Sequence, residues 1–201
     1  MDGGRLEAFS DGVFAVAITL LALDLVVPGP GHGPLAGQLA ERWPSFAAYL
    51  VSFLTIGIVW VNHHTVFKGF AHIDRPMLFL NLLMLFFVVS VPFATRTVAE
   101  FLTGGGPNAG VAAAVYQGVF LGMSLGFGSL FWWAVAHEHL KTPLTRGGAR
   151  TAVIRFAAGN LFYAIAIGVA FVSPTASLGI AGVIAVYYAF EQTPAIRPGP
   201  A

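Results

Sequence analysis

Six long apolar stretches alternate with short polar or glycine- and proline-rich breaks along this chain of 201 residues. A helix needs about 20 mostly apolar residues to cross the hydrocarbon core of a bilayer. None of the stretches alternates between apolar and polar residues as the strands of a membrane barrel do. The pattern therefore predicts an all-α membrane protein with six transmembrane helices. We place these helices at residues 5–27, 45–66, 76–98, 110–136, 150–172 and 175–191.

The breaks carry residues that end helices. Residues 28–34 read Pro-Gly-Pro-Gly-His-Gly-Pro, and residues 104–107 read Gly-Gly-Gly-Pro. A tight turn at Ser173 and Pro174 separates the last two stretches. No connection is long enough to hold a separate domain, and no internal repeat is visible. We therefore expect one transmembrane domain over residues 1–201, with a short sixth span that crosses with some tilt or local thinning of the bilayer.

Composition supports a membrane protein. Apolar residues make up 57% of the chain and charged residues only 9%, with a mean hydropathy of +0.78. Soluble domains typically carry about 25% charged residues, so most of this surface must face lipid. The net charge of +1 and the lack of a basic cluster give no basis for a nucleic-acid partner. The chain has no cysteine, and no hydrolase or zinc-protease motif appears, so we expect no enzyme activity and no cofactor.

The distribution of lysine and arginine predicts the orientation. Two of these residues, Arg42 and Arg96, fall on one side of the predicted spans, and eight fall on the other. Under the positive-inside rule, this split places both termini in the cytoplasm of a protein of the cell membrane. The eight are Arg5, Lys68, Arg75, Lys141, Arg146, Arg150, Arg155 and Arg197.

Polar and charged residues open the first predicted helix. Arg5, Ser10 and Asp11 stand where this helix enters the membrane. An ionised carboxylate costs at least ~2.5 kcal/mol at the bilayer centre, so such residues usually mark an ion pathway or a structural contact. Partners for Asp11 are available among Ser10 and Arg5 nearby and among Asn62, His63, His64 and Asn81 on the next two helices.

The residues after Asp11 form an aliphatic stripe. At 100° per residue, Val16, Leu20 and Leu23 fall within about 60° of one another, and Thr19 lies at their edge. Asp11 lies roughly opposite Val16. Periodicity alone favours helix packing or lipid contact for such a stripe, and a pore lining is the alternative.

Two further patterns predict helix packing. His63 and His64 point about 100° apart on a helix, so they cannot both bind one metal ion through regular geometry. We expect no metal site here, and histidines that hydrogen-bond helices together. Gly118, Gly122 and Gly126 form a small-residue strip where another helix can approach closely, within the subunit or between subunits.

The opening motif carries a family resemblance. The spacing Arg5-x-x-x-Phe9-Ser10-Asp11-Gly12 resembles the signature of the transmembrane protein 175 family, the endolysosomal potassium channels of animals and their prokaryotic relatives. Trp60-Val-Asn-His63-His64 on the second predicted helix and Asn81 on the third also resemble this family.

The resemblance implies a homotetramer in the lipid bilayer whose first helices line a four-fold pore. It implies passive conduction of monovalent cations, with a preference for K⁺ that is weak over Na⁺. The hydrophobic constriction falls on Val16, Leu20 and Leu23, with Thr19 as a polar layer. A structural network that braces the pore helix falls on Arg5, Phe9, Ser10, Asp11, Trp60, His63, His64 and Asn81.

Asp24, near the outer end of the first predicted helix, has two interpretations. A ring of such carboxylates would attract cations to the outer mouth. A helix-end residue among lipid headgroups is the equal alternative.

Two other functions remain open from the sequence. A proton-coupled secondary transporter would use Asp11 and the second-helix histidines as a proton relay. A non-transporting subunit of a membrane assembly would produce no flux at all. The residues predict neither the gating stimulus nor the permeability to protons.

Overall fold

The structure is a computed structural model that describes residues 3–190. All regular structure in this range is helical apart from one isolated bridge between Phe70 and Leu140. Arg197 of the charge count and the last residue of the sixth predicted span lie outside the described residues. The helices are α1 (Gly3–Ala22), α2 (Leu35–Glu41), α3 (Trp43–Lys68), α4 (Arg75–Gly104), α5 (Gly106–Ala136), α6 (Arg146–Ala170) and α7 (Pro174–Phe190).

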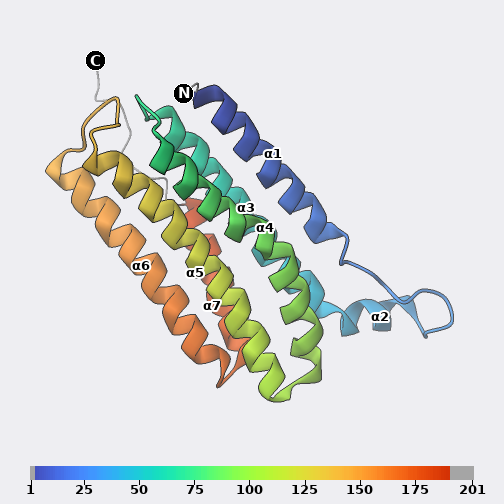
Figure 1. Cartoon of the computed structure of the whole chain (residues 1–201). Coiled ribbons are helices and arrows are strands. Elements are labelled where there is room, and N and C mark those ends of the chain that lie inside the picture. The colour runs from blue at the N-terminus through green and yellow to red at the C-terminus, as the bar shows by residue number, and fades with distance from the viewer. Residues whose placement is uncertain (1–2, 191–201) are drawn as a thin grey trace.

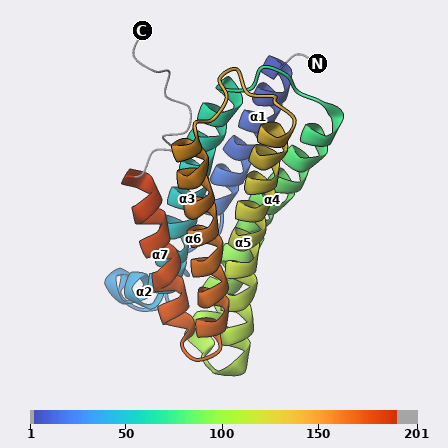
Figure 2. The same cartoon turned by 90° about the vertical axis from the view of Figure 1, so that its left-hand side faces the viewer.

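The six longer helices lie side by side as an antiparallel bundle (Figures 1 and 2). α1 stands at one edge, where it packs mainly against α3 and α4. α5 lies between α4 and α6, and α7 packs against α6, α3 and α5. The start of α1, the end of α3 and the end of α5 lie at the same end of the bundle. We call this the N-terminal end, and the other the loop end.

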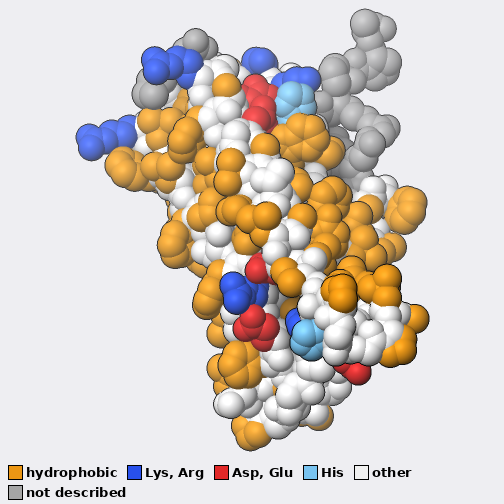
Figure 3. All heavy atoms as spheres, turned by 90° about the vertical axis from the view of Figure 1, so that its right-hand side faces the viewer, with side chains coloured by type: hydrophobic (Ala, Val, Ile, Leu, Met, Phe, Trp, Pro, Cys, Tyr) orange, Lys and Arg blue, Asp and Glu red, His pale blue; other side chains and the backbone are white. Residues whose placement is uncertain are grey.

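Four helices in the described range are long and apolar enough to cross a membrane, namely α3, α4, α5 and α6. α1 has 20 residues but carries Arg5, Glu7 and Asp11, and α7 has only 17 residues. Figure 3 shows mainly hydrophobic and uncharged side chains between the charges at the N-terminal end and a second charged patch lower on this face. The fold is therefore that of an all-α integral membrane protein.

The structure differs from the expected first span at its far end. α1 ends at Ala22 and not at residue 27, so Leu23 and Asp24 lie in a turn beyond the helix. Val27 precedes Pro28, and a residue before proline is disfavoured in the α conformation. The aliphatic stripe on the helix proper therefore ends at Leu20.

The connection from α1 to α3 contains a helix that the apolar pattern did not predict. α2 has seven residues and lies beside the bundle (Figure 1). The buried side chain of Gln38 closes this loop: its Nε2 donates to the carbonyls of Gly29 and Gly33 at 3.0 and 2.9 Å, and its Oε1 accepts from Gly29 N at 2.9 Å. Gly29 and Gly33 have φ of 94° and 91°, a region that glycine adopts without steric cost.

The glycine strip of α5 packs within the subunit. A Cβ atom on Gly126 would lie 2.9 Å from Met84 Cα, and one on Gly122 would lie 2.2 Å from the ring of Phe87. Both neighbours belong to α4, so the two helices approach closely along this strip. A Cβ on Gly118 would meet nothing within 4 Å.

Two loops join at the N-terminal end of the bundle. Ala71 N donates to His139 O at 2.7 Å, and Lys141 N donates to Gly69 O at 2.9 Å. Asp74 caps α4 by accepting from Met77 N at 2.9 Å, and it also accepts from Trp133 Nε1 of α5 at 3.0 Å. Desolvation acts to raise the pKa of Asp74, but these two hydrogen bonds and the nearby histidines outweigh it and hold the pKa below 3.8.

Candidate functional site: the first helix and its supports

α1 presents two contrasting faces. Ser10, Phe14, Ala17 and Leu21 recur at spacings of four, three and four residues and are buried against α3 and α4. The opposite side of the helix is exposed in the single chain, although most of its residues are apolar. A helix whose apolar residues lie on both sides needs a second apolar or lipid environment for its uncovered face.

A chain of hydrogen bonds holds the buried face. The Asn81 amide of α4 donates from Nδ2 to Ser10 Oγ at 3.0 Å, and Ser10 Oγ in turn donates to Leu6 O at 2.9 Å. His63 Nε2 of α3 lies 3.0 Å from Asn81 Oδ1. Because that oxygen can only accept, the imidazole must carry a proton on Nε2. All of these side-chain groups donate in one direction, from α3 through α4 to α1.

The imidazole of His63 is fully buried. It stacks on Phe67 with ring centroids 3.9 Å apart and meets the edge of Phe14 at 5.4 Å. Aromatic rings on two sides and an amide on the third restrict its orientation. The hydrogen-bond chain is therefore anchored in a packed core.

A second set of contacts joins α1 directly to α3. Trp60 Nε1 donates to Asp11 Oδ1 at 2.8 Å, and His64 Nδ1 lies 2.5 Å from Glu7 Oε1. Trp60 and His64 are themselves stacked, with centroids 6.3 Å apart. The candidates proposed for Asp11 were its neighbours, the histidines and the asparagines, whereas its hydrogen-bond donor is the indole of Trp60.

The predicted pore residues lie on the exposed face. Val16 is 56% exposed, Leu20 41% and Leu23 70%. Thr19 is exposed beside them, and its hydroxyl donates to Val16 O at 2.9 Å. The hydroxyl oxygen of Thr19 therefore keeps acceptor capacity on this face.

Arg5 and Phe9 lie on this exposed face as well. Helical phase puts them within about 40° of Val16, and both are exposed in the single chain. The hydrogen bonds of Ser10 and Asp11 described above, to Leu6, Asn81 and Trp60, involve neither of them. The opening motif therefore divides between two faces: Ser10 and Asp11 point to the supports, and Arg5 and Phe9 to the uncovered side.

Asp24 lies close to the side chain of an arginine. Its Oδ1 is 3.8 Å from Arg96 Nη1 of α4, and Arg96 Nε donates to Glu100 Oε1 at 2.9 Å. These residues line a polar cavity of about 280 Å³ between the end of α1 and the neighbouring ends of α3 and α4. The carboxylate expected at the outer mouth is thus accompanied by an arginine.

No group of three or more histidine, aspartate or glutamate side chains in residues 3–190 is arranged to hold a metal ion. His63 and His64 point to different neighbours, Asn81 and Glu7. The histidine pair thus contributes two separate contacts between helices.

Comparison with known proteins identifies the family of this chain. Residues 5–92 match a family model described as "Endosomal/lysosomal potassium channel TMEM175". The chain is 50% identical over 195 residues to a protein of Streptomyces collinus named as a potassium channel, covering 96% of this chain and 94% of that one. The chain belongs to the TMEM175 family.

The architecture is also that of the TMEM175 family. The crystal structure of a homolog from Chamaesiphon minutus, described as a lysosomal potassium-selective channel TMEM175 homolog, matches with a TM-score of 0.82. It is 38% identical and covers 94% of this chain and 96% of that one. The family and these relatives are ion channels, so the chain is a membrane-embedded member of a channel family and not an enzyme.

Vertebrate relatives match a shorter part of the chain. The TMEM175 protein of Gallus gallus, named as an endosomal/lysosomal proton channel, is 42% identical over 106 residues. This alignment covers 48% of the present chain and 21% of the chicken protein.

Proposed function

We propose that this chain is one subunit of a potassium channel in which four copies arrange α1 around a central pore. The observation that carries the proposal is the uncovered apolar face of α1, at the edge of the bundle and opposite its hydrogen-bonded face. Relatives named as potassium channels support the choice of ion. All six long helices would then cross the cell membrane, with α1 shielded from lipid by its neighbours in the assembly.

In this proposal, rings of aliphatic side chains close the pore. Four copies of Leu20 and four of Val16 would form two layers one helical turn apart. Such a hydrophobic constriction stops ions when it dewets and passes a partly hydrated cation when it widens. Thr19 would offer its hydroxyl oxygen between the layers. Because Leu23 lies beyond the end of α1, we assign the narrowest layer to Leu20.

The buried face of α1 would set the position of these rings. Ser10 and Asp11 attach the helix to Asn81 and Trp60, so they act as positioning residues. Arg5 and Phe9 would face the inner mouth or a neighbouring subunit. A preference for K⁺ that is weak over Na⁺ follows from a constriction without fixed carbonyl ligands. Both termini would lie in the cytoplasm, where seven of the described lysines and arginines gather.

Reconstitution tests the proposal. Purified protein in liposomes should pass K⁺ passively down its gradient, and Na⁺ more slowly. Leu20→Ala should raise K⁺ flux several-fold because the shorter side chains widen the narrowest layer of the pore. Leu161→Ala, an exposed leucine on α6 away from α1, should leave flux within about twofold. Well-folded oligomers without K⁺ flux would exclude a channel, and equal flux in the two variants would exclude the constriction.

Proton permeation is a second candidate, favoured by the names of the vertebrate relatives. It would run through the same pore, and proton flux in the same liposomes tests it. The proton-coupled transporter requires uphill uptake driven by a pH gradient and loss of that coupling in Asp11→Asn. The hydrogen bonds of Asp11 and His63 between helices favour a structural role over a relay.

A further inference from the structure

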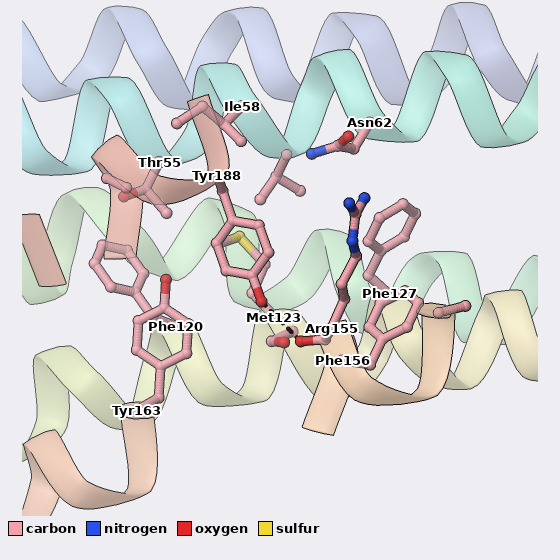
Figure 4. A pocket seen from close by; sticks show the side chains of 14 residues that line it. Thr55, Ile58, Asn62, Phe120, Met123, Phe127, Arg155, Phe156, Tyr163 and Tyr188 are labelled. Atoms are coloured by element: carbon pink, nitrogen blue, oxygen red, sulfur yellow. Dashed lines mark hydrogen bonds between the residues drawn. The ribbon is translucent and has the colours of Figure 1, made fainter. Parts of the chain in front are cut away.

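A cavity of about 100 Å³ lies between α3, α5, α6 and α7, with α3 standing between it and α1 (Figure 4). Aromatic and aliphatic side chains form most of its wall, among them Phe120, Phe127, Phe156 and Met123. The proposed pore makes no use of this space. An engineered apolar cavity of about 150 Å³ holds a benzene molecule, so this one has room for a few carbon atoms.

One end of the cavity is polar and positively charged. Figure 4 shows the guanidinium group of Arg155 pointing from α6 towards the amide of Asn62 on α3. None of the described residues that line the cavity is acidic. An apolar pocket that ends at an arginine and an amide complements a molecule with an apolar chain and an anionic group.

The depth of Arg155 suits a headgroup. Tyr188 Oη donates to Arg155 O at 2.8 Å, so Arg155 is level with the last turn of α7. Tyr187 and Tyr188 stand together there, and tyrosines favour the boundary between the bilayer and water. Arg155 therefore lies at the depth of these tyrosines, beside Phe127 and Phe156, and the part of the cavity lined by Phe120 and Tyr163 lies further from the N-terminal end of the bundle (Figure 4).

Close packing maintains this arrangement. A Cβ atom on Gly159 would lie 2.5 Å from Tyr188 Oη, so α6 has room for the tyrosine only because residue 159 is glycine. The contact holds the end of α7 against α6 beside the cavity. The cavity beside this contact is thus a result of the close packing of α6 and α7.

We propose that this cavity binds an anionic phospholipid of the surrounding membrane. The guanidinium of Arg155 pairs with the lipid phosphate, because its planar fork matches phosphate oxygens in a bidentate geometry. The amide of Asn62 donates a further hydrogen bond. Part of one acyl chain enters between Met123, Phe120 and Tyr163 while the remainder stays in the bilayer. Basic pockets between membrane helices recognise lipid headgroups in this way.

Native mass spectrometry of the purified full-length oligomer tests the site. Delipidated protein is titrated with phosphatidylglycerol and, separately, with phosphatidylcholine. We expect one tightly held phosphatidylglycerol per subunit and at least tenfold weaker binding of phosphatidylcholine. Arg155→Gln should weaken phosphatidylglycerol binding about tenfold. Arg155→Lys, which keeps the charge and loses the fork, should weaken it less.

The matched control is Arg150→Gln. Arg150 is an exposed arginine on the same helix that does not line the cavity, so this change should alter binding less than twofold. Equal losses in the two glutamine variants would show a general charge effect and overturn the site. A thermal unfolding curve for each variant checks that it is folded.

Two further arms test the choice of ligand. Tighter binding of palmitate than of phosphatidylglycerol would overturn the phospholipid in favour of a free fatty acid. Phosphatidylglycerol binding that occurs only after deletion of residues 191–201 would show that the chain's own end fills the cavity, which would also overturn the proposal.

Discussion

The packing of α1 against its neighbours differs from the packing of α5 against α4. α1 is held by side-chain hydrogen bonds, above all those of Asn81 and Trp60. α5 approaches α4 directly along the backbones, with Gly126 against Met84, and one hydrogen bond from Trp133 to Asp74 joins the two at the N-terminal end. A hydrogen-bonded contact between helices can open and re-form with side-chain rotation, whereas a close-packed strip has no room to adjust. The contact between α4 and α5 is therefore rigid. The contacts that hold α1, the helix assigned to the pore, are adaptable.

This difference has a functional meaning under the proposed mechanism. A hydrophobic constriction opens only if α1 moves or rotates, and elements that move are drawn from the less stable parts of a fold. Hydrogen bonds between membrane helices contribute about 0.6 kcal/mol on average. Several such bonds hold α1 in one position without preventing its release.

The largest effect on the free energy of unfolding is expected at the contact between α4 and α5. Gly126→Ala would place a Cβ 2.9 Å from Met84 Cα, and a backbone atom cannot turn aside. The two helices must separate, and overpacking of this kind costs about 1–3 kcal/mol. Unfolding in detergent, followed by circular dichroism, measures the loss.

The control on the same strip is Gly118→Ala. A Cβ there meets nothing within 4 Å, so the free energy of unfolding should be unchanged or rise by up to ~1 kcal/mol through helix propensity. Equal destabilisation by the two alanines would contradict the close approach of α4 and α5.

The next largest effect is expected at Asn81. Asn81→Ala leaves the buried Nε2–H of His63 without its acceptor and removes the donor to Ser10. An unsatisfied buried group costs about 1–3 kcal/mol, and membrane proteins lie at the low end of that range. Hydrogen exchange should rise in α1 while α5 stays protected.

Ser90→Ala is the control on the same helix, because the exposed hydroxyl of Ser90 donates only to Phe86 O of its own helix. It should change neither stability nor exchange. Equal hydrogen exchange in α1 and α5 after Asn81→Ala would mean that the contacts of both helices open together. That result would contradict the difference between the two contacts.

Asp74 makes the contact between α4 and α5 sensitive to acid. Asp74→Ala removes the N-cap of α4 and the acceptor of Trp133, at a cost of about 1 kcal/mol at pH 7. Because the folded state holds the pKa of Asp74 below 3.8, this stabilisation is present above that pH and is lost as the pH falls through the folded pKa.

Unfolding measured at pH 7 and near pH 3 checks the sign: the difference between variant and wild type should shrink in acid. Glu100→Ala, at the other end of α4, is the control, since its exposed ion pair with Arg96 contributes little. A difference that grows in acid would refute the assignment.

The smallest effect is expected from Trp60→Phe. This change keeps an aromatic ring but removes the hydrogen bond to Asp11, for a loss of about 0.5–1 kcal/mol. Trp43→Phe, at the opposite end of α3 and of similar exposure, should have no effect. K⁺ flux should change only in the first variant, because Trp60 is the one that donates a hydrogen bond to Asp11 of α1. Unchanged flux there would remove Trp60 from the supports of the pore helix.

The apolar pattern predicted the long helices well, because a membrane span needs a continuous apolar run that a sequence displays directly. α3 begins at Trp43 and ends at Lys68, close to the expected 45–66. α2 was missed because seven residues in a proline- and glycine-rich connection carry no such signal. The end of α1 was placed too far along because Leu25, Val26 and Val27 are apolar but lie before Pro28.

The contacts of the supports were harder to predict. Helical phase indicates that Asp11 faces other helices, but it cannot select a partner, and a tryptophan near a helix end suggests the bilayer surface more than a hydrogen-bond donor. The separation of Arg5 and Phe9 from Ser10 follows from their spacing, although a motif written along the chain suggests one unit. Contacts such as Ala71 with His139 join distant segments, and no local pattern encodes them.

The amide of Gln38 gives the connection between α1 and α3 a mechanical property. With Gly29 and Gly33 both bonded to the side chain of Gln38, residues 29–38 form a closed loop, which leaves a shorter part of the connection free to stretch. A flexible linker would absorb a shift of the far end of α1, but a closed one transmits that shift to the start of α3. α1 and α3 are thus coupled at both ends, by side chains near Asp11 and by the loop beyond Ala22. A tilt of one of these helices therefore acts on the other.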